Sequence, residues 1–198
     1  YRGAAPIQWA VAMGETVTGN STMLLEEGLD TGPILLQQQV EIGEEQTAAD
    51  LFDVLARTGA PLVVETLAKL ANGSIEPQAQ DDARATLAPL LQREDGRMDF
   101  AARTAVELKN RWRGFQPWPG AFTQLDGKKL IVHRMALAES AGGAGAPGEI
   151  HIEGNRLLVA CAQNTWLELV EVQLEGKRRL GAADFMRGMQ MGAGARLG

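Results

Sequence analysis

The segment Gly28-Leu29-Asp30-Thr31-Gly32 places one carboxylate in a short turn between two glycines. Apolar runs that are typical of strands precede and follow this turn. A carboxylate fixed in this way can take part in proton transfer, or can orient a histidine and stabilise its positive charge. Asp is also common in turns where its side chain only closes an Asx-type hydrogen bond, and the turn by itself favours this structural role. The function of Asp30 therefore depends on what the rest of the chain builds around it.

The composition is that of an ordinary globular protein. The chain has 198 residues, of which 45% are hydrophobic and 22% charged, enough for one large domain or two small ones. No apolar run approaches the roughly 20 residues that a membrane span needs, and no signal peptide is visible. Cys161 is the single cysteine and has no Cys or His at metal-ligand spacing. These features predict a cytoplasmic protein without a membrane partner or a bound metal, with Cys161 buried in the core.

The net charge of −6 is divided unevenly along the chain. Residues 1–100 carry 6 Lys and Arg against 16 Asp and Glu, whereas residues 101–198 carry 13 against 9. Such an asymmetry suggests two modules with different partners, of which the second could face a polyanion. An ordinary surface would give the same small positive balance, so the charge alone leaves both interpretations open.

Residues 1–73 have the pattern of an incomplete α/β domain. The apolar spacing of Ala4–Glu15 predicts a helix with Pro6 in its first turn, and residues 21–27 and 34–42 are strand-like. Two strands and two helices make a poor sheet on their own. We therefore expect that a preceding part is missing, and that a sheet edge and an apolar face are exposed.

A long helical region completes this part. Thr47–Asp50 has the Thr-x-x-Asp form of an N-terminal capping box, and Asn72-Gly73 is a typical C-terminal cap. Between them, Gly59–Pro61 predicts a kink or a division into two helices. Residues 74–99 are polar and show no period, so we expect them to form a linker that lies over the surface.

Residues 100–198 change to short strands that are separated by turns. A helix is predicted over Phe100–Phe115, and Asp126-Gly127 is a strong hairpin signal. Further strand-like runs follow, with a second hairpin turn at Glu153–Asn155 and a closing helix over residues 181–190. Several short antiparallel strands at this spacing are typical of a small barrel.

Three segments resemble the methionyl-tRNA formyltransferase family, and they occur in the family's order. Residues 1–35 resemble the latter half of its catalytic domain, and they contain the Asp30 turn. Glu94–Phe100 resembles the junction between its two domains. Phe115–Phe122 resembles the aromatic-proline segment that opens its C-terminal domain.

The resemblance implies an α/β domain followed by a β domain. Residues 1–73 would be the C-terminal part of a Rossmann-like formyltransferase domain, residues 74–99 a linker, and residues 100–198 an OB-like β-barrel domain that binds tRNA. The implied reaction transfers a formyl group from 10-formyltetrahydrofolate to the amino group of methionyl initiator tRNA. The implied protein is a monomer when full length, with no metal and no DNA partner.

In this family an Asn, a His and an Asp act together, and the matching Asp is Asp30. The Asn and His lie before the segment with which this chain begins, so we expect the chain by itself to be inactive. The Asn and His would stabilise the oxyanion that forms when the amine attacks the formyl carbon, and Asp30 would set the tautomer of the His and help to move the amine proton. The resemblance also implies folate contacts from Gly28, Leu29, Asp30 and Thr31. Arg2 and Gly3 either shape a substrate pocket or only lead into the following helix, with Arg2 on the surface, and the sequence leaves both interpretations open.

Basic residues of the second half are the candidates for contacts with tRNA phosphates. Such contacts give affinity and steep salt dependence without reading the base sequence. Trp112, Phe115 and Trp118 could stack on bases, although packing of the helix against the barrel is the more common role of such residues. The candidate phosphate contacts are Arg111, Arg113, Lys128, Lys129, Arg134, Lys177, Arg178 and Arg179.

Two other interpretations remain. A formyltransferase or hydrolase for another substrate would use the same turn, but the basic second half and the Phe115–Phe122 segment argue against it. A non-catalytic tRNA-binding module is a different class of protein, and such a module has no need for Asp30. His133 and His151 match no motif of the family, and we expect structural roles for both.

Overall fold

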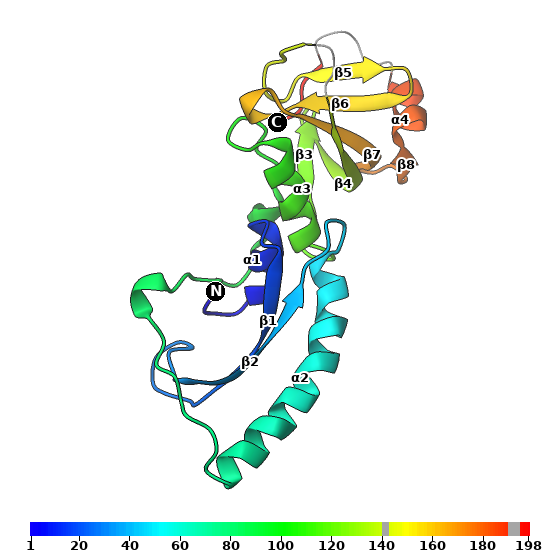
Figure 1. Cartoon of the computed structure of the whole chain (residues 1–198). Helices are drawn as coiled ribbons and strands as arrows, with labels where there is room; N and C mark the ends of the chain where they lie inside the picture. Colours follow the sequence, from blue (N-terminus) through cyan, green and yellow to red (C-terminus); the bar gives the residue numbers. More distant parts are fainter. Residues whose placement is uncertain (140–142, 190–194) are drawn as a thin grey trace. The chain divides into compact units, whose positions relative to one another are not determined.

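The computed structural model describes residues 1–139, 143–189 and 195–198 (Figure 1). The chain forms two compact units, Tyr1–Leu91 and Gln92–Gly198, and each is considered by itself. None of the helices in the described part combines the length and the apolar character that a membrane crossing requires.

The first unit is built on an antiparallel pair of strands, β1 (Val17–Met23) and β2 (Ile34–Glu41) (Figure 1). The prediction for the second strand is confirmed. The first strand lies four residues earlier than the predicted range 21–27, because the polar stretch around Gly19 pairs with β2 although it has no apolar pattern. The Asp30 turn therefore belongs to a longer loop that joins the two strands.

Two helices pack on this strand pair. α1 (Pro6–Ala12) has its proline at the first helical position, as predicted. α2 (Ala48–Ala71) begins with the predicted capping box between Thr47 and Asp50. The predicted division of α2 is wrong, since the helix continues through Pro61. Pro61 is exposed, so the backbone carbonyl that loses its partner one turn earlier is accessible to water.

The core of the first unit is small, and α2 leaves apolar side chains uncovered. The buried cluster consists of Ala10, Val11, Ile42, Ala48, Leu51 and Leu55. Phe52, Val63, Val64 and Leu67 on α2 are exposed. These side chains give α2 an exposed apolar face, whereas the predicted exposed face of the sheet stays a prediction.

Residues 78–88 were predicted to be part of a linker, but they are hydrogen-bonded to the first unit, and we call them the crossing segment. Gln78 exchanges two backbone hydrogen bonds of 2.8 Å with Ile34. Further along, the N–H of Arg2 donates to the carbonyl of Thr86 at 2.8 Å. The crossing segment thus connects the start of β2 with the residues before α1.

The described part of the second unit forms an antiparallel sheet with two α-helices. Its elements are α3 (Ala105–Gly114), β3 (Phe122–Leu125), β4 (Lys128–Ala138), β5 (Ile150–Glu153), β6 (Arg156–Ala160), β7 (Trp166–Leu174), β8 (Leu180–Gly181) and α4 (Ala182–Met189). The strand order is β3-β4-β7-β6-β5, with β8 beside β7. Asp126 and Gly127 both have positive φ and form the predicted hairpin turn. The predicted closing helix is α4, and Gln190 lies outside the described residues.

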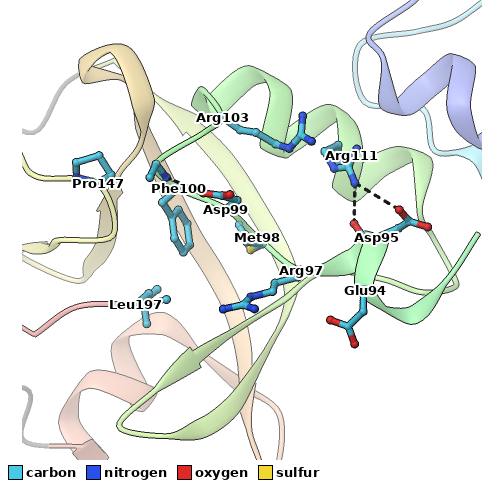
Figure 2. A pocket seen from close by; sticks show the side chains of 12 residues that line it. Glu94, Asp95, Arg97, Met98, Asp99, Phe100, Arg103, Arg111, Pro147 and Leu197 are labelled. Carbon is cyan, nitrogen blue, oxygen red and sulfur yellow. Dashed lines mark hydrogen bonds and ion pairs between the residues drawn. The ribbon is translucent and has the colours of Figure 1, made fainter.

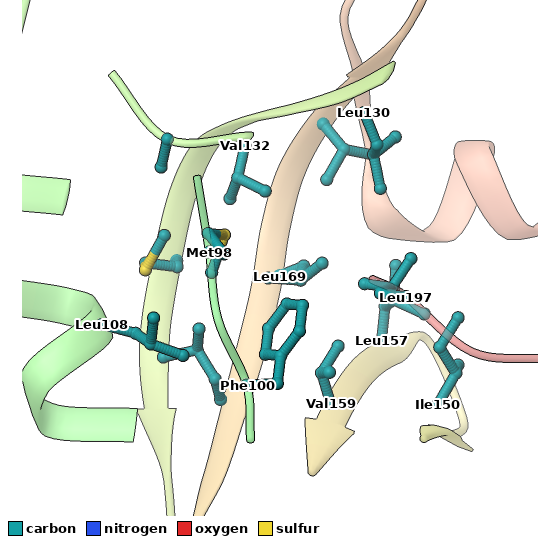
Figure 3. Packing of buried hydrophobic residues seen from close by; sticks show 14 of the residues in the cluster. Met98, Phe100, Leu108, Leu130, Val132, Ile150, Leu157, Val159, Leu169 and Leu197 are labelled. Carbon is teal, nitrogen blue, oxygen red and sulfur yellow. The ribbon is translucent and has the colours of Figure 1, made fainter. Parts of the chain in front are cut away.

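The core of the second unit joins the strands to residues from the predicted linker. Leu157 and Leu169 are fully buried, and Leu108 of α3 belongs to the same cluster (Figure 3). Met98 and Phe100 are also part of this core (Figure 3). Residues 74–99 are therefore not a free linker, because residues 78–88 are hydrogen-bonded within the first unit and Met98 is buried in the second.

Cys161 lies in the core of the second unit, and the described sheet of this unit has open edges. Cys161 is buried, as predicted, and burial raises the pKa of its thiol to about 12. In the described part of the chain the edge strands β3 and β5 are not paired with each other. An antiparallel β domain is therefore observed, whereas closure into a barrel is not.

Candidate functional site

The carboxylate of Asp30 is fixed by a contact far away in the sequence. Its Oδ2 accepts a hydrogen bond of 2.8 Å from the N–H of Gly3, 27 positions earlier. The φ angle of Asp30 is +52°, in the left-handed region that Asp adopts more readily than most residues. The observed bond is non-local, unlike an Asx-type bond, so the structure gives Asp30 a role beyond closing its own turn.

Gln80 of the crossing segment holds the backbone of the same loop. Its Nε2 donates to the carbonyl of Asp30 at 2.8 Å and to the carbonyl of Gly32 at 2.7 Å. Its Oε1 accepts from Nη2 of Arg2 at 3.0 Å. No sequence pattern marks Gln80, because it is one of several polar residues in a stretch without periodicity.

Arg2 is anchored on two sides. Besides Gln80, its Nη2 contacts Oδ1 of Asp82 at 2.8 Å, and its side chain is only 13% exposed. Gly3 contributes its backbone N–H to the site. A side chain at Gly3 would bring Cβ to 2.6 Å from the carbonyl oxygen of Ala88, so this position admits only glycine.

A cavity of about 510 Å³ lies beside these residues. Asp30, Arg2 and Gln80 line it together with residues of α1, β1 and β2. Tyr1 also lines it, and burial together with a hydrogen bond to Glu15 raises the pKa of Tyr1 to about 12. The phenol therefore stays protonated at neutral pH. The size and the mixed polar and apolar walls suit a small organic ligand.

The two glycines of the Asp30 turn have different surroundings. A Cβ on Gly32 would lie 1.7 Å from the backbone oxygen of Leu24, whereas a Cβ on Gly28 would lie 2.4 Å from Oγ1 of Thr31. A side chain can rotate away more easily than a backbone carbonyl can move. The turn therefore requires glycine more strictly at position 32, beside the Leu24 carbonyl, than at position 28.

The predicted folate contacts are only partly brought to the cavity. Asp30 lines it, but Gly28, Leu29 and Thr31 do not. Leu29 is 62% exposed. The assignment of these three residues to folate stays a prediction.

Two of the eight basic residues proposed for tRNA are largely enclosed in the second unit. Arg113 is only 5% exposed, so its charge does not reach a phosphate in solvent without rearrangement. Arg111 lies over the ring of Phe115 and donates to the carbonyl of Asp95 at 3.0 Å. Burial lowers the pKa of Arg111, and the charge of nearby Arg103 lowers it further. Arg111 ties α3 to Asp95 and Arg113 is buried, which speaks against their predicted role as phosphate contacts.

The other six basic residues are better placed. Lys129 is half-buried, with its Nζ 4.0 Å from the centroid of the Phe122 ring, and Arg179 is paired with Glu171. The exposed members of this set are Lys128, Arg134, Lys177, Arg178 and Arg179. Their contact with tRNA stays a prediction.

A separate cavity of about 560 Å³ lies within the second unit (Figure 2). Its lining mixes three arginines with three acids, and Arg111 is already bonded to Asp95 (Figure 2). The charged lining residues are Arg97, Arg103, Arg111, Glu94, Asp95 and Asp99. Since these charges balance, the cavity has no evident preference for an anion or a cation.

Solved structures with the same fold include formyl-transferring enzymes. HypX from Aquifex aeolicus, in complex with tetrahydrofolic acid, superposes with a TM-score of 0.63 and 17% identity, over 97% of this chain and 34% of that chain. An N-formyltransferase from Helicobacter canadensis, in complex with folinic acid and dTDP-3-aminofucose, gives a TM-score of 0.65 and 17% identity, over 85% of this chain and 61% of that one. At these identities the likeness shows the fold.

The sequence matches are closer. Residues 1–67 match the family model described as formyl transferase, and residues 90–190 match the model of the formyl transferase C-terminal domain. Curated relatives named methionyl-tRNA formyltransferase are 60% identical in Acidobacterium capsulatum and 52% identical in Koribacter versatilis, over all of this chain. The chain spans 63% and 62% of the lengths of these two relatives. This chain therefore belongs to the formyl transferase family, and its resemblance to the methionyl-tRNA formyltransferases is confirmed.

Proposed function

We propose that the intact gene product transfers a formyl group from 10-formyltetrahydrofolate to the amino group of methionyl initiator tRNA, and that this chain supplies Asp30 to the reaction. One observation carries the proposal. The Asp30 carboxylate is held at 2.8 Å by the N–H of Gly3 beside a cavity of about 510 Å³, in a chain 60% identical to a protein named methionyl-tRNA formyltransferase.

The chemistry requires a carboxylate in a fixed position. The amine of the methionyl group attacks the formyl carbon, negative charge develops on the formyl oxygen, and the amine must lose a proton. An Asn amide and a His N–H, expected before Tyr1, stabilise that oxygen, each contributing roughly 3–4 kcal/mol in comparable sites. Asp30 orients the His, balances its positive charge and helps to remove the amine proton.

The two units have separate tasks in this proposal. The first is the later part of a Rossmann-like domain that binds the folate co-substrate, which agrees with the tetrahydrofolic acid named for HypX. The second is an OB-like domain whose exposed basic residues, including Lys177 and Arg178, contact tRNA phosphates. The protein is cytoplasmic and monomeric, and uses no metal.

The test is a charge-removing substitution of Asp30 in the intact gene product. Asn tolerates the left-handed φ of +52°, and its Oδ1 still accepts from the N–H of Gly3, so Asp30→Asn removes the charge and keeps the loop. We expect kcat for formylation of methionyl-tRNA to fall by about two to four orders of magnitude. Asp53→Asn, on the exposed face of α2, is the matched control and leaves kcat unchanged.

Two results would contradict the proposal. Near-normal turnover of Asp30→Asn would remove Asp30 from the chemistry. If the intact wild-type protein formylated another amine but not methionyl-tRNA, the proposed substrate would be wrong, whereas the proposed role of Asp30 would stand.

A further inference from the structure

We propose that Gln80 is a positioning residue for the Asp30 carboxylate; the catalytic part of this inference rests on the proposed function. Gln80 lies 50 positions after Asp30, in a segment that the sequence predicts to be a linker. Its amide nitrogen donates to the carbonyl oxygens of Asp30 and Gly32 at 2.8 and 2.7 Å. One side chain thus fixes the backbone on both sides of Thr31.

The loop needs such support because burial does not hold it. Leu25 is 91% exposed and Leu29 is 62% exposed, so the apolar side chains of the loop give it little anchorage. Asp30 is in the left-handed region, a strained conformation for a residue with a side chain, which persists when surrounding contacts determine it. The bond from Gln80 to the Asp30 carbonyl is one of these contacts.

The amide group is chemically suited to this position. Its two N–H groups can serve two carbonyl oxygens, while its own oxygen accepts from Arg2 at 3.0 Å. A glutamate of the same shape would keep the contact with Arg2 but would turn an oxygen toward the two carbonyl oxygens. A methionine would have the same length with neither donor nor acceptor. Gln80→Glu therefore removes the two donor bonds and keeps the contact with Arg2, whereas Gln80→Met removes all three interactions.

A matched control lies two residues earlier. Gln78 belongs to the same crossing segment, its side chain is exposed, and its hydrogen bonds with Ile34 are made by the backbone. Gln78→Glu and Gln78→Met make the same chemical changes in the same segment without touching the Asp30 loop.

The first measurement follows the loop without using activity. In the intact gene product, the Gly3 amide is protected from hydrogen exchange while it donates to Asp30 Oδ2. We expect Gln80→Met and Gln80→Glu to raise the exchange rate of this amide, measured by NMR, by about tenfold, since two hydrogen bonds that hold the loop are lost. The two Gln78 variants leave this rate unchanged. Equal exchange rates in the Gln78 and Gln80 variants would overturn the proposal.

The second measurement is steady-state formylation at saturating folate. We expect kcat of both Gln80 variants to fall by about 10- to 100-fold, the effect of a misplaced catalytic group, with the KM for methionyl-tRNA and the Tm close to wild type. A fall in activity that follows only the loss of Tm would show a purely structural role and overturn the catalytic part. Inactive wild-type protein would reject the proposed function, while the exchange of the Gly3 amide would still decide whether Gln80 holds the loop.

Discussion

The Asp30 loop should tolerate a methyl group at one of its glycines and not at the other. A Cβ at Gly32 would lie 1.7 Å from the backbone oxygen of Leu24, and real contacts of this kind are essentially never closer than 3.0 Å, so backbone must move by about 1.3 Å. Overpacking of this kind costs about 1–3 kcal/mol of unfolding free energy. A shift of that size also displaces the Asp30 carboxylate, and a displacement of this size lowers kcat by about 100-fold.

Gly28→Ala provides the matched comparison in the same loop. There the new Cβ would meet Oγ1 of Thr31 at 2.4 Å and its Cγ2 at 2.7 Å, and rotation of that side chain relieves the contact. Alanine also restricts the unfolded chain, which offsets part of the remaining cost by up to about 1 kcal/mol. We therefore expect Gly28→Ala to stay within about 0.5 kcal/mol of wild type, as surface substitutions usually do.

The assay is urea-induced unfolding of both variants, followed by formylation kinetics of the intact gene product. The reasoning requires Gly32→Ala to be less stable than both wild type and Gly28→Ala, and to have a lower kcat than both. It would be refuted if Gly32→Ala were as stable as Gly28→Ala, or if Gly32→Ala lost stability while its kcat stayed normal. The second result would separate the packing of Leu24 from the position of the Asp30 carboxylate.

Two further predictions concern the second unit. Hydrogen bonds from the backbone and the hydroxyl of Thr104 hold the pKa of Glu107 below its usual range. The ionised Glu107 therefore stabilises the folded state above the usual glutamate pKa of about 4.3. This stabilisation is lost as the pH falls through the lowered pKa. The unfolding free energy of wild type minus that of Glu107→Gln should therefore be constant from neutral pH to pH 5 and should shrink in more acidic buffer; a difference that grows on acidification would contradict this sign. Replacing Lys177, Arg178 and Arg179 by alanine should lower the salt slope of tRNA binding by about one to three units, whereas an unchanged slope would reject these phosphate contacts.

Local patterns predicted the elements whose determinants are adjacent in sequence. The capping box at Thr47, the hairpin at Asp126-Gly127 and the position of Pro6 at the start of α1 all follow from side chains within a few residues of one another. β1 was placed too late because its polar residues become a strand only by pairing with β2. The division of α2 at Pro61 was wrong because the lost backbone bond lies on the solvent side of the helix.

The sequence predicted Asp30 as the acid of the candidate site, but it did not predict Gln80, which holds the loop of that acid. Asp30 is marked by its flanking glycines and by the resemblance to a family. Gln80 stands in a polar stretch in which no local pattern distinguishes it, and its importance comes from contacts 48 and 50 positions away. Arg113 shows the opposite error, since a positive charge in the sequence suggested a surface contact, whereas the folded unit buries it.

The position of the crossing segment in the chain also sets the order in which the site is completed during synthesis. The ribosome makes Gln80 50 residues after Asp30, which at roughly 5–20 residues per second is an interval of about 3–10 s. β2 and α2 are made during that interval, but until it ends the Asp30 loop lacks the bonds from Gln80, and a long stretch of chain must close to form them. A nascent chain that stops after α2 would therefore contain Asp30 but lack Gln80, the residue that holds the Asp30 loop in position.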